Sequence, residues 1–170
     1  RQDLTLCDLV AREGRAVVLA LSKWDAVEDK TGTLREVNSK MEDVLPEIRG
    51  VPVVTLSAMR GRGIDKLMKA VFDADRRWNI RITTSKLNRW LEGALERNAP
   101  PAPSGRRIKI RYATQANARP PTFAIFGNQL NKLPESYLRY LMNGLRADFG
   151  LDGVPIRFSL RGGKNPYEDK

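Results

Sequence analysis

The chain has 170 residues, of which 41% are hydrophobic, so it can bury a core and is not a disordered polymer. It has no histidine and one cysteine, Cys7, which excludes a Ser-His-Asp triad, most zinc sites and an internal disulfide. The net charge is +10, with +2 in residues 1–82 and +8 in residues 83–170, which is typical of phosphate-backbone binding or of a solvated surface.

The first half of the chain alternates between helical and strand-like patterns. Apolar residues recur at helical spacing in 3–13, and the apolar run at 16–21 is typical of a strand buried on both faces. A second helix is predicted over 33–48, a second buried strand over 51–58 and a third helix over 63–80. This order predicts a doubly wound α/β sheet, in which right-handed crossovers bring the loops after both strands to one edge.

The third predicted helix has one strongly apolar stripe. Its members are Ile64, Leu67, Met68, Val71 and Phe72.

The pattern changes near residue 82, where a second, smaller domain is predicted. The predicted elements are a helix over 83–98, strands over 107–112 and 120–128, a helix over 134–150 and a strand over 154–162. This order predicts a small α+β domain whose two helices cover one face of a three-stranded sheet. In the first strand, alternation places Ile108, Ile110 and Tyr112 towards the helices.

The loop after the first strand contains a candidate guanine clamp. It reads Ser22-Lys23-Trp24-Asp25, and the Asp25 carboxylate could accept both donors on one edge of guanine. The apolar stem of Lys23 could lie along the base. Such a short motif is more often an ordinary exposed turn.

The loop after the second strand strengthens the guanine interpretation. It begins Ser57-Ala58-Met59 and continues through Gly61 and Gly63 into a helix. The backbone N–H of Ala58 could donate to guanine O6, and a small side chain would let the base approach. Two such loops, at the same sheet edge and in this order, favour guanine recognition over an ordinary turn.

Four segments together resemble the bacterial tandem-GTPase family called Der or EngA. They are "ALSKWD", "VTLSAMRGRGIDKL", "WNIRITTSKLNRWL" and "GGKNPY". The resemblance implies that residues 1–82 are the C-terminal half of a P-loop GTPase domain and that 83–170 are a KH-like domain. It implies GTP or GDP as ligand, Mg²⁺ in the intact domain, and a role in assembly of the large ribosomal subunit. Era, another GTPase with a KH domain, is a weaker match because "FGNQ" at 126–129 supplies no Gly-x-x-Gly loop.

Two departures from the family pattern affect the expected activity. Ser22 stands where the family has Asn, so one bracing hydrogen bond is expected to be lost or water-mediated. The phosphate loop Gly-x-x-x-x-Gly-Lys-Ser/Thr is missing, and "GGK" at 162–164 does not replace it because no helix follows. We therefore expect the chain alone not to hydrolyse GTP and the N-terminal GTPase domains to be its partners.

The basic second domain allows two interpretations. Its predicted sheet places one group of cations on the open face: Arg107, Lys109, Arg111, Arg157 and Arg161. These side chains could meet phosphates of rRNA in the large ribosomal subunit, or the face could dock on another domain of the protein. The rival hypotheses are a stand-alone RNA-binding module and a protein-interaction module, each with a degenerate GTPase scaffold.

The sequence is also expected to belong to a cytoplasmic protein that does not enter a membrane. Its longest aliphatic run, 16–21, is far too short to cross a bilayer, and no secretory leader is recognisable. A single cysteine fits a reducing compartment.

Overall fold

The computed structural model describes residues 2–45, 48–102 and 108–162. The chain forms two compact units, Arg1–Ile80 with Leu151–Ile156, and Arg81–Gly150 with Arg157–Lys170. The boundary predicted from sequence places 151–156 in the second domain, whereas in the structure they belong to the first unit. The predicted α/β class with a second, α+β part is confirmed.

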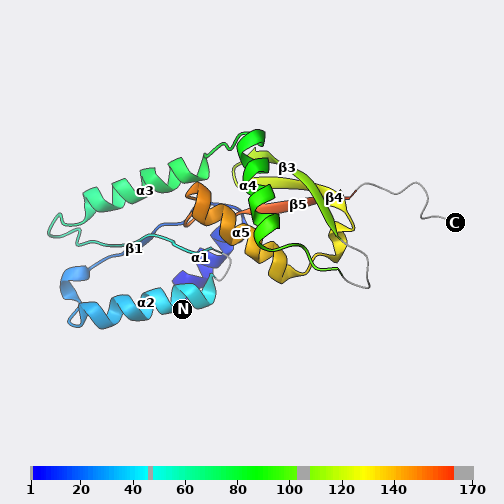
Figure 1. The fold of residues 1–170 in the computed structure, drawn as a ribbon. Helices are drawn as coiled ribbons and strands as arrows, with labels where there is room; N and C mark the ends of the chain where they lie inside the picture. Colours follow the sequence, from blue (N-terminus) through cyan, green and yellow to red (C-terminus); the bar gives the residue numbers. More distant parts are fainter. Residues whose placement is uncertain (1, 46–47, 103–107, 163–170) are drawn as a thin grey trace. The chain divides into compact units, whose positions relative to one another are not determined.

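The first unit is a layered α/β structure around two short parallel strands. Its elements are α1 (Gln2–Arg12), β1 (Leu19–Leu21), the 3-10 helix η1 (Trp24–Ala26), α2 (Lys30–Val44), β2 (Val53–Thr55) and α3 (Ile64–Trp78). Leu19 pairs with Val53 and Leu21 with Thr55. Figure 1 shows α1 and α2 on one side of the strands and α3 on the other. All three predicted helices form, but each strand is only three residues long.

The core of this unit lies between α1, α2 and the strands. It is formed by the buried side chains of Ala11, Val17, Met41, Leu45 and Ile48. Helix α2 begins after Asp29, whose carboxylate accepts from the Gly32 N–H at 2.8 Å, because an oxygen at this position satisfies an otherwise unpaired amide. The Trp78 indole N–H donates to the Gly14 carbonyl at 2.9 Å and ties the end of α3 to the end of α1.

One burial prediction for this unit is wrong, and one apolar surface is exposed. Ala20 in β1 is exposed, although the sequence predicts a strand buried on both faces. The α3 stripe is also exposed, with 46% of Ile64, 45% of Met68 and 62% of Phe72 accessible to solvent. The physical reason is the size of the sheet: two three-residue strands are too narrow to cover a helix of 15 residues.

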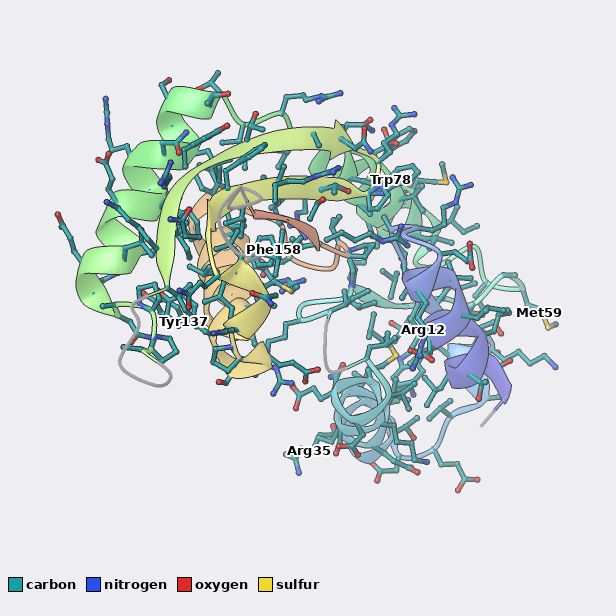
Figure 2. The ribbon with its side chains drawn as sticks, turned by 90° about the vertical axis from the view of Figure 1, so that its right-hand side faces the viewer. Arg12, Arg35, Met59, Trp78, Tyr137 and Phe158 are labelled. Carbon is teal, nitrogen blue, oxygen red and sulfur yellow. The ribbon has the colours of Figure 1, made fainter. Side chains whose placement is uncertain are left out.

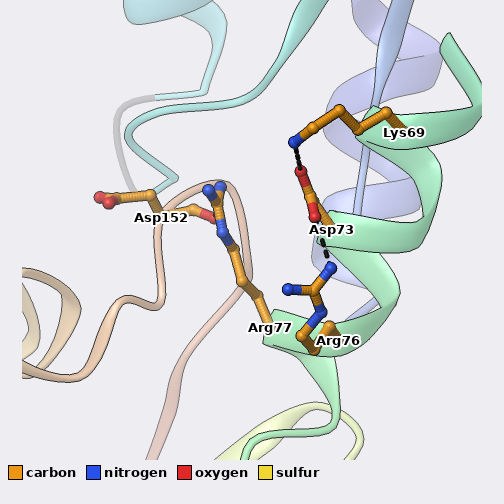
Figure 3. Close-up of polar contacts among 5 residues, drawn as sticks. All are labelled: Lys69, Asp73, Arg76, Arg77 and Asp152. Atoms are coloured by element: carbon orange, nitrogen blue, oxygen red, sulfur yellow. Dashed lines mark hydrogen bonds and ion pairs between the residues drawn. The ribbon is translucent and has the colours of Figure 1, made fainter. Parts of the chain in front are cut away.

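The polar side of α3 carries an ion-pair network (Figure 3). Asp73 accepts from Lys69 at 2.8 Å and from Arg76 at 2.7 Å, and the Lys69 hydrogen bond lowers the pKa of Asp73. Arg77 donates to the Asp152 carbonyl at 3.4 Å, so α3 also contacts the 151–156 segment within this unit. Exposed pairs of this kind contribute little to stability, and they leave the apolar stripe on the other side uncovered.

The second unit contains two helices and one three-stranded sheet. Its elements are α4 (Thr84–Arg97), β3 (Lys109–Ala118), β4 (Pro121–Asn128), the 3-10 helix η3 (Leu130–Lys132), α5 (Glu135–Phe149) and β5 (Arg157–Gly162). The strand order is β3-β4-β5, with β3 antiparallel and β5 parallel to β4. Helices α4 and α5 lie beside this sheet in Figure 1, and the predicted element order is confirmed.

Apolar packing and three polar contacts hold α4 to α5. The deepest side chains of the unit, each at most 2% exposed, include Leu87, Leu91, Phe123, Leu141 and Leu145. The Trp90 indole donates to Asp148 at 2.8 Å, and the hydroxyls of Tyr137 and Tyr140 donate to backbone carbonyls of Asn98 and Ala94. Burial raises the pKa of Tyr137 to about 12, so its hydroxyl remains a donor at any ordinary pH.

The exposed α3 stripe gives a first prediction. Replacing Met68 and Phe72 together by Ser should lower self-association of the chain and its binding of an apolar dye, because both side chains are exposed. The melting temperature should change little. Replacing the buried Leu87 by Ala should instead lower the free energy of unfolding by about 2–5 kcal/mol without reducing self-association. Light scattering and thermal melting of both variants test this, and an equal loss of stability in the two would show that the stripe is packed.

Candidate nucleotide site

The parallel pairing of β1 and β2 brings the two candidate loops together. Beyond the strands, the Leu56 N–H donates to the Leu21 carbonyl at 2.9 Å, and the Trp24 N–H donates to the Leu56 carbonyl at 3.1 Å. These backbone bonds join residues that are more than thirty positions apart in sequence. The first loop is therefore held directly against the second at the carboxyl edge of the sheet, as predicted for parallel strands.

The second loop is closed by its own hydrogen bonds. Ser57 and Arg62 exchange two backbone bonds, of 2.9 and 3.1 Å, and the Gly61 N–H donates to the Ala58 carbonyl at 3.2 Å. Gly61 and Gly63 both have left-handed φ angles, +60° and +85°. A Cβ at Gly63 would collide with the Thr55 carbonyl oxygen, whereas a Cβ at Gly61 would meet nothing within 4 Å. The backbone at Gly63 therefore requires glycine on two grounds.

Asp25 lies where the two loops meet. The nearby Ser57 hydroxyl, its own backbone amide, and the charges of Arg60 and Lys30 all lower the pKa of its carboxyl. The Arg60 Nε lies 4.0 Å from the carboxylate. A lowered pKa keeps the carboxylate ionised, and so an acceptor only, until the pH falls below the usual range of aspartate.

A depression of about 230 Å³ opens beside this carboxylate. Its walls come from both loops and from the starts of α2 and α3: Trp24, Asp25, Lys30, Thr55, Leu56, Ser57, Arg60, Arg62, Gly63 and Lys66. The Ser57 hydroxyl is buried and makes no hydrogen bond of ordinary geometry, even though it lies close enough to Asp25 to lower its pKa. The ionised carboxylate beside this buried hydroxyl is an acceptor that a ligand with N–H donors could engage.

The remaining predicted clamp residues lie outside the walls of the depression. Ser22, Lys23 and Ala58 are exposed. Met59 is 95% exposed, and its side chain extends away from the fold in Figure 2. Lys23 has φ 53° and ψ 34°, a left-handed backbone that costs a residue with a Cβ about 1–2 kcal/mol and turns the chain sharply before Asp25.

Four cations that the motifs did not indicate also line the depression: Lys30, Arg60, Arg62 and Lys66. Arg60 and Arg62 flank Gly61 in the loop that follows the second strand. Two cations beside a loop glycine are the sequence feature that could have indicated them. Lys30 and Lys66 lie in the first turns of α2 and α3, and only the folded arrangement brings them to this edge.

The candidate basic face lies in the second unit, on the sheet. Lys109, Arg111, Arg157 and Arg161 are exposed there, and Arg107 lies outside the described residues. The prediction that Tyr112 faces the helices is wrong, because it is 46% exposed while Ala113 is 3% exposed. The register explains the change: Ile110 pairs with Gly127 and Tyr112 with Phe126, so Arg111 is an extra residue that reverses the alternation.

Two features are absent from the part of the chain that the structure describes. Within it, no three His, Cys, Asp or Glu side chains are grouped closely enough to hold a metal ion. No helix within the same residues is long and apolar enough to span a bilayer.

Comparison with known proteins relates the chain to one family. Residues 81–161 match a family described as the C-terminal KH-domain-like domain of EngA bacterial GTPase enzymes. The whole chain aligns with proteins named GTPase Der: it is 54% identical to that of Ruegeria pomeroyi, 53% to that of Rhizobium etli and 52% to that of Agrobacterium fabrum. It spans only 35–36% of the length of these relatives.

The two loop glycines give a second prediction. Gly63→Ala should lower the free energy of unfolding by at least about 2 kcal/mol, because it combines a left-handed φ with a collision against backbone. Gly61→Ala is the matched control and should cost only about 1 kcal/mol, since its Cβ would meet open space. Urea unfolding of both variants measures the difference. Equal losses would mean that the loop relaxes around residue 63 and that its shape is not fixed there.

Proposed function

The chain belongs to the Der (EngA) family as its C-terminal part, and on this premise we propose that it carries the guanine-recognition loops and the KH-like domain of a longer GTP-binding protein. The observation that carries the proposal is the meeting of Asp25 and Ser57 in one depression, from two loops tied by the Trp24–Leu56 backbone bond. A chance Lys-Trp-Asp turn in the first loop would not need to lie beside Ser57 of the second loop.

Guanine recognition would rest mainly on Asp25. Its ionised carboxylate can accept from both the N1–H and the exocyclic amine of guanine, a bidentate pair that adenine cannot reproduce. The pKa-lowering neighbours of Asp25 favour this charge state. We propose that the Ala58 N–H donates to O6, that the Ser57 hydroxyl donates to the carboxylate, and that Lys23 and Trp24 flank the base. Met59, which extends away from the fold, is given no contact with the base.

Ser22 is the clearest difference from the expected clamp. The resemblance to the family implies Asn at this position, whose longer side chain could brace the loop. Loss of one hydrogen bond would weaken nucleotide binding by on the order of 1 kcal/mol. Guanine preference would remain, because it depends on Asp25.

Hydrolysis is proposed for the longer protein and not for this chain alone. Phosphoryl transfer depends on backbone N–H groups, a Lys and Mg²⁺ around the phosphates. The 170 residues contain no such phosphate loop. We propose that GTP or GDP with Mg²⁺ is held jointly by these loops and by N-terminal GTPase domains, whose apolar surfaces would cover the exposed α3 stripe.

The KH-like unit is proposed to meet rRNA of the large ribosomal subunit in the cytoplasm. Its sheet is strongly basic. The Gly-x-x-Gly pattern in this part of the chain, Gly150-Leu151-Asp152-Gly153, runs from the end of α5 into the first unit and has Leu151 fully buried, which favours contact through the sheet over the usual KH capture of single strands. We propose that the nucleotide bound by the GTPase part biases the position of this unit. The same face could instead dock on another domain, and the fourth prediction separates the two.

One rival proposal is a stand-alone RNA-binding or protein-interaction module on a degenerate scaffold. Binding of a fluorescent GDP analogue by the longer protein would contradict it. Failure to bind, in a folded sample with Mg²⁺ present, would favour it.

The guanine assignment gives the third prediction. In the longer protein, Asp25→Asn should weaken GTP binding at least about tenfold and improve binding of xanthosine triphosphate, because an amide offers a donor to the xanthine carbonyl. Ser22→Asn should leave GTP affinity unchanged or raise it. Asp65→Asn, an exposed carboxylate outside the depression, is the control.

Titration of each variant with GTP and with xanthosine triphosphate measures the binding affinities. Phosphate release measures hydrolysis, and the 170-residue chain is the sample expected to release none. An Asp25→Asn protein that binds GTP as tightly as its parent would contradict the clamp. Mg²⁺-dependent turnover by the purified 170-residue chain would contradict the assignment of hydrolysis to the longer protein.

The basic sheet gives the fourth prediction. Replacing Lys109, Arg111 and Arg161 by Glu should weaken rRNA binding and reduce its dependence on salt, because three phosphate-facing charges are reversed. A matched triple change at exposed Arg35, Lys40 and Arg49 in the first unit should have a smaller effect. If RNA affinity is unchanged and the melting temperature of the longer protein falls, the face is a docking surface and the RNA proposal is wrong.

A further inference from the structure

The open sheet face of the second unit carries aromatic side chains among its cations. The Tyr112 ring lies on the Phe126 ring across β3 and β4, with centroids 4.4 Å apart and planes within 7°. Tyr112 is 46% exposed. Because Phe126 covers only one face of the Tyr112 ring, this exposure leaves aromatic surface in contact with water.

The register extends this pair into a row across all three strands. Phe126 pairs with Tyr112 on one side and with Arg161 on the other. Register partners project to the same face of a sheet, so a phenol, a phenyl ring and a guanidinium stand in sequence on one surface. Lys109 lies on the same face of β3, two positions before the bulge residue Arg111, and both cations are exposed.

Charge is divided between the two layers of this unit. No Asp or Glu occurs between Glu96 and Glu135, so β3 and β4 have no acidic residue, and β5 has none either. The acidic side chains of the helices, Glu92, Glu96, Glu135 and Asp148, belong to α4 and α5. In the part of the unit that the structure describes, the charged side chains of the three strands are therefore all cationic. Such a surface complements a polyanion better than an uncharged partner.

A helix side chain fixes the strand that presents Tyr112. Directly after the bulge, Asn88 of α4 donates to the Ala113 carbonyl at 2.9 Å and accepts from the Ala113 N–H at 2.8 Å. These bonds replace the strand neighbour that β3 lacks on this edge. The shift that turns Tyr112 outward is thus held in place before any ligand binds, which lowers the entropy lost on binding.

We infer that the row formed by Tyr112, Phe126 and Arg161 is a stacking platform for an unpaired base of single-stranded RNA, with Lys109 and Arg111 on the neighbouring phosphates. This inference rests on the proposed RNA role of the sheet and names its substrate class. Aromatic rings take unpaired bases regardless of sequence, whereas bases inside a duplex already stack on each other. The platform therefore selects unpaired over paired RNA.

The experiment measures binding of the 170-residue chain to fluorescein-labelled oligo(A) RNA and to a blunt RNA duplex of the same length, over roughly 50 to 200 mM salt. Tyr112→Ala should weaken oligo(A) binding about tenfold and leave duplex binding and the salt slope unchanged. Tyr112→Phe should bind like the parent, because only the hydroxyl is lost. Tyr112→Leu keeps apolar cover on Phe126 but should weaken binding like Ala.

Two controls separate stacking from charge and from folding. Lys109→Gln with Arg111→Gln should reduce the salt slope for both RNAs. Phe72→Ala, which removes an exposed ring from the first unit, should change neither the RNA affinity nor the salt slope. If Tyr112→Ala lowers the affinity for both RNAs equally, or for neither, the platform is overturned. The charge variants test the proposed RNA role separately. Absence of any RNA binding by the parent at low salt would overturn both.

Discussion

The candidate nucleotide site depends on one backbone hydrogen bond, from the Trp24 N–H to the Leu56 carbonyl. It extends the parallel pairing of β1 and β2 past the ends of both strands. Because it uses backbone atoms, it fixes the relative position of the loops whatever their side chains are. Asp25 follows Trp24 directly, and Ser57 follows Leu56 directly. The two groups that define the depression are therefore each one residue away from the bond that joins their loops.

The second unit uses a comparable device with a side chain in place of a strand. The Asn88 amide matches the backbone of Ala113 as a neighbouring strand would, which secures an edge that otherwise has unpaired groups. It acts at the residue after Tyr112, where the extra residue in β3 has just reversed the alternation. The bulge at Arg111 thus determines whether the open face of the sheet is only basic or both basic and aromatic.

Features set by neighbouring residues, such as helix ends, could be predicted from the sequence. Features set by pairing between distant strands could not. Capping rules explain why the helices predicted over 83–98 and 134–150 have the expected start and end. In the structure Thr83 precedes α4, and Gly150, with φ 66°, ends α5. The outward position of Tyr112 could not be predicted from residues 107–112, which alternate strictly between basic and apolar or aromatic side chains. The bulge that turns it outward is defined only by the pairing of β3 with β4. The place of Arg60 beside Asp25 likewise depends on pairing between strands, and the exposure of the α3 stripe depends on sheet width.

The segment 151–156 shows how the two units are linked by the chain itself. It joins α5 to β5, which both belong to the second unit, yet it is part of the first. Leu151 and Val154 are fully buried, and the Gly153 N–H donates to the Arg49 carbonyl at 2.7 Å. The chain therefore passes between the units three times, near residues 80, 150 and 156, and not once as in a simple linker arrangement. Segment 151–156 therefore belongs by its packing to the first unit, while its two ends continue into α5 and β5 of the second.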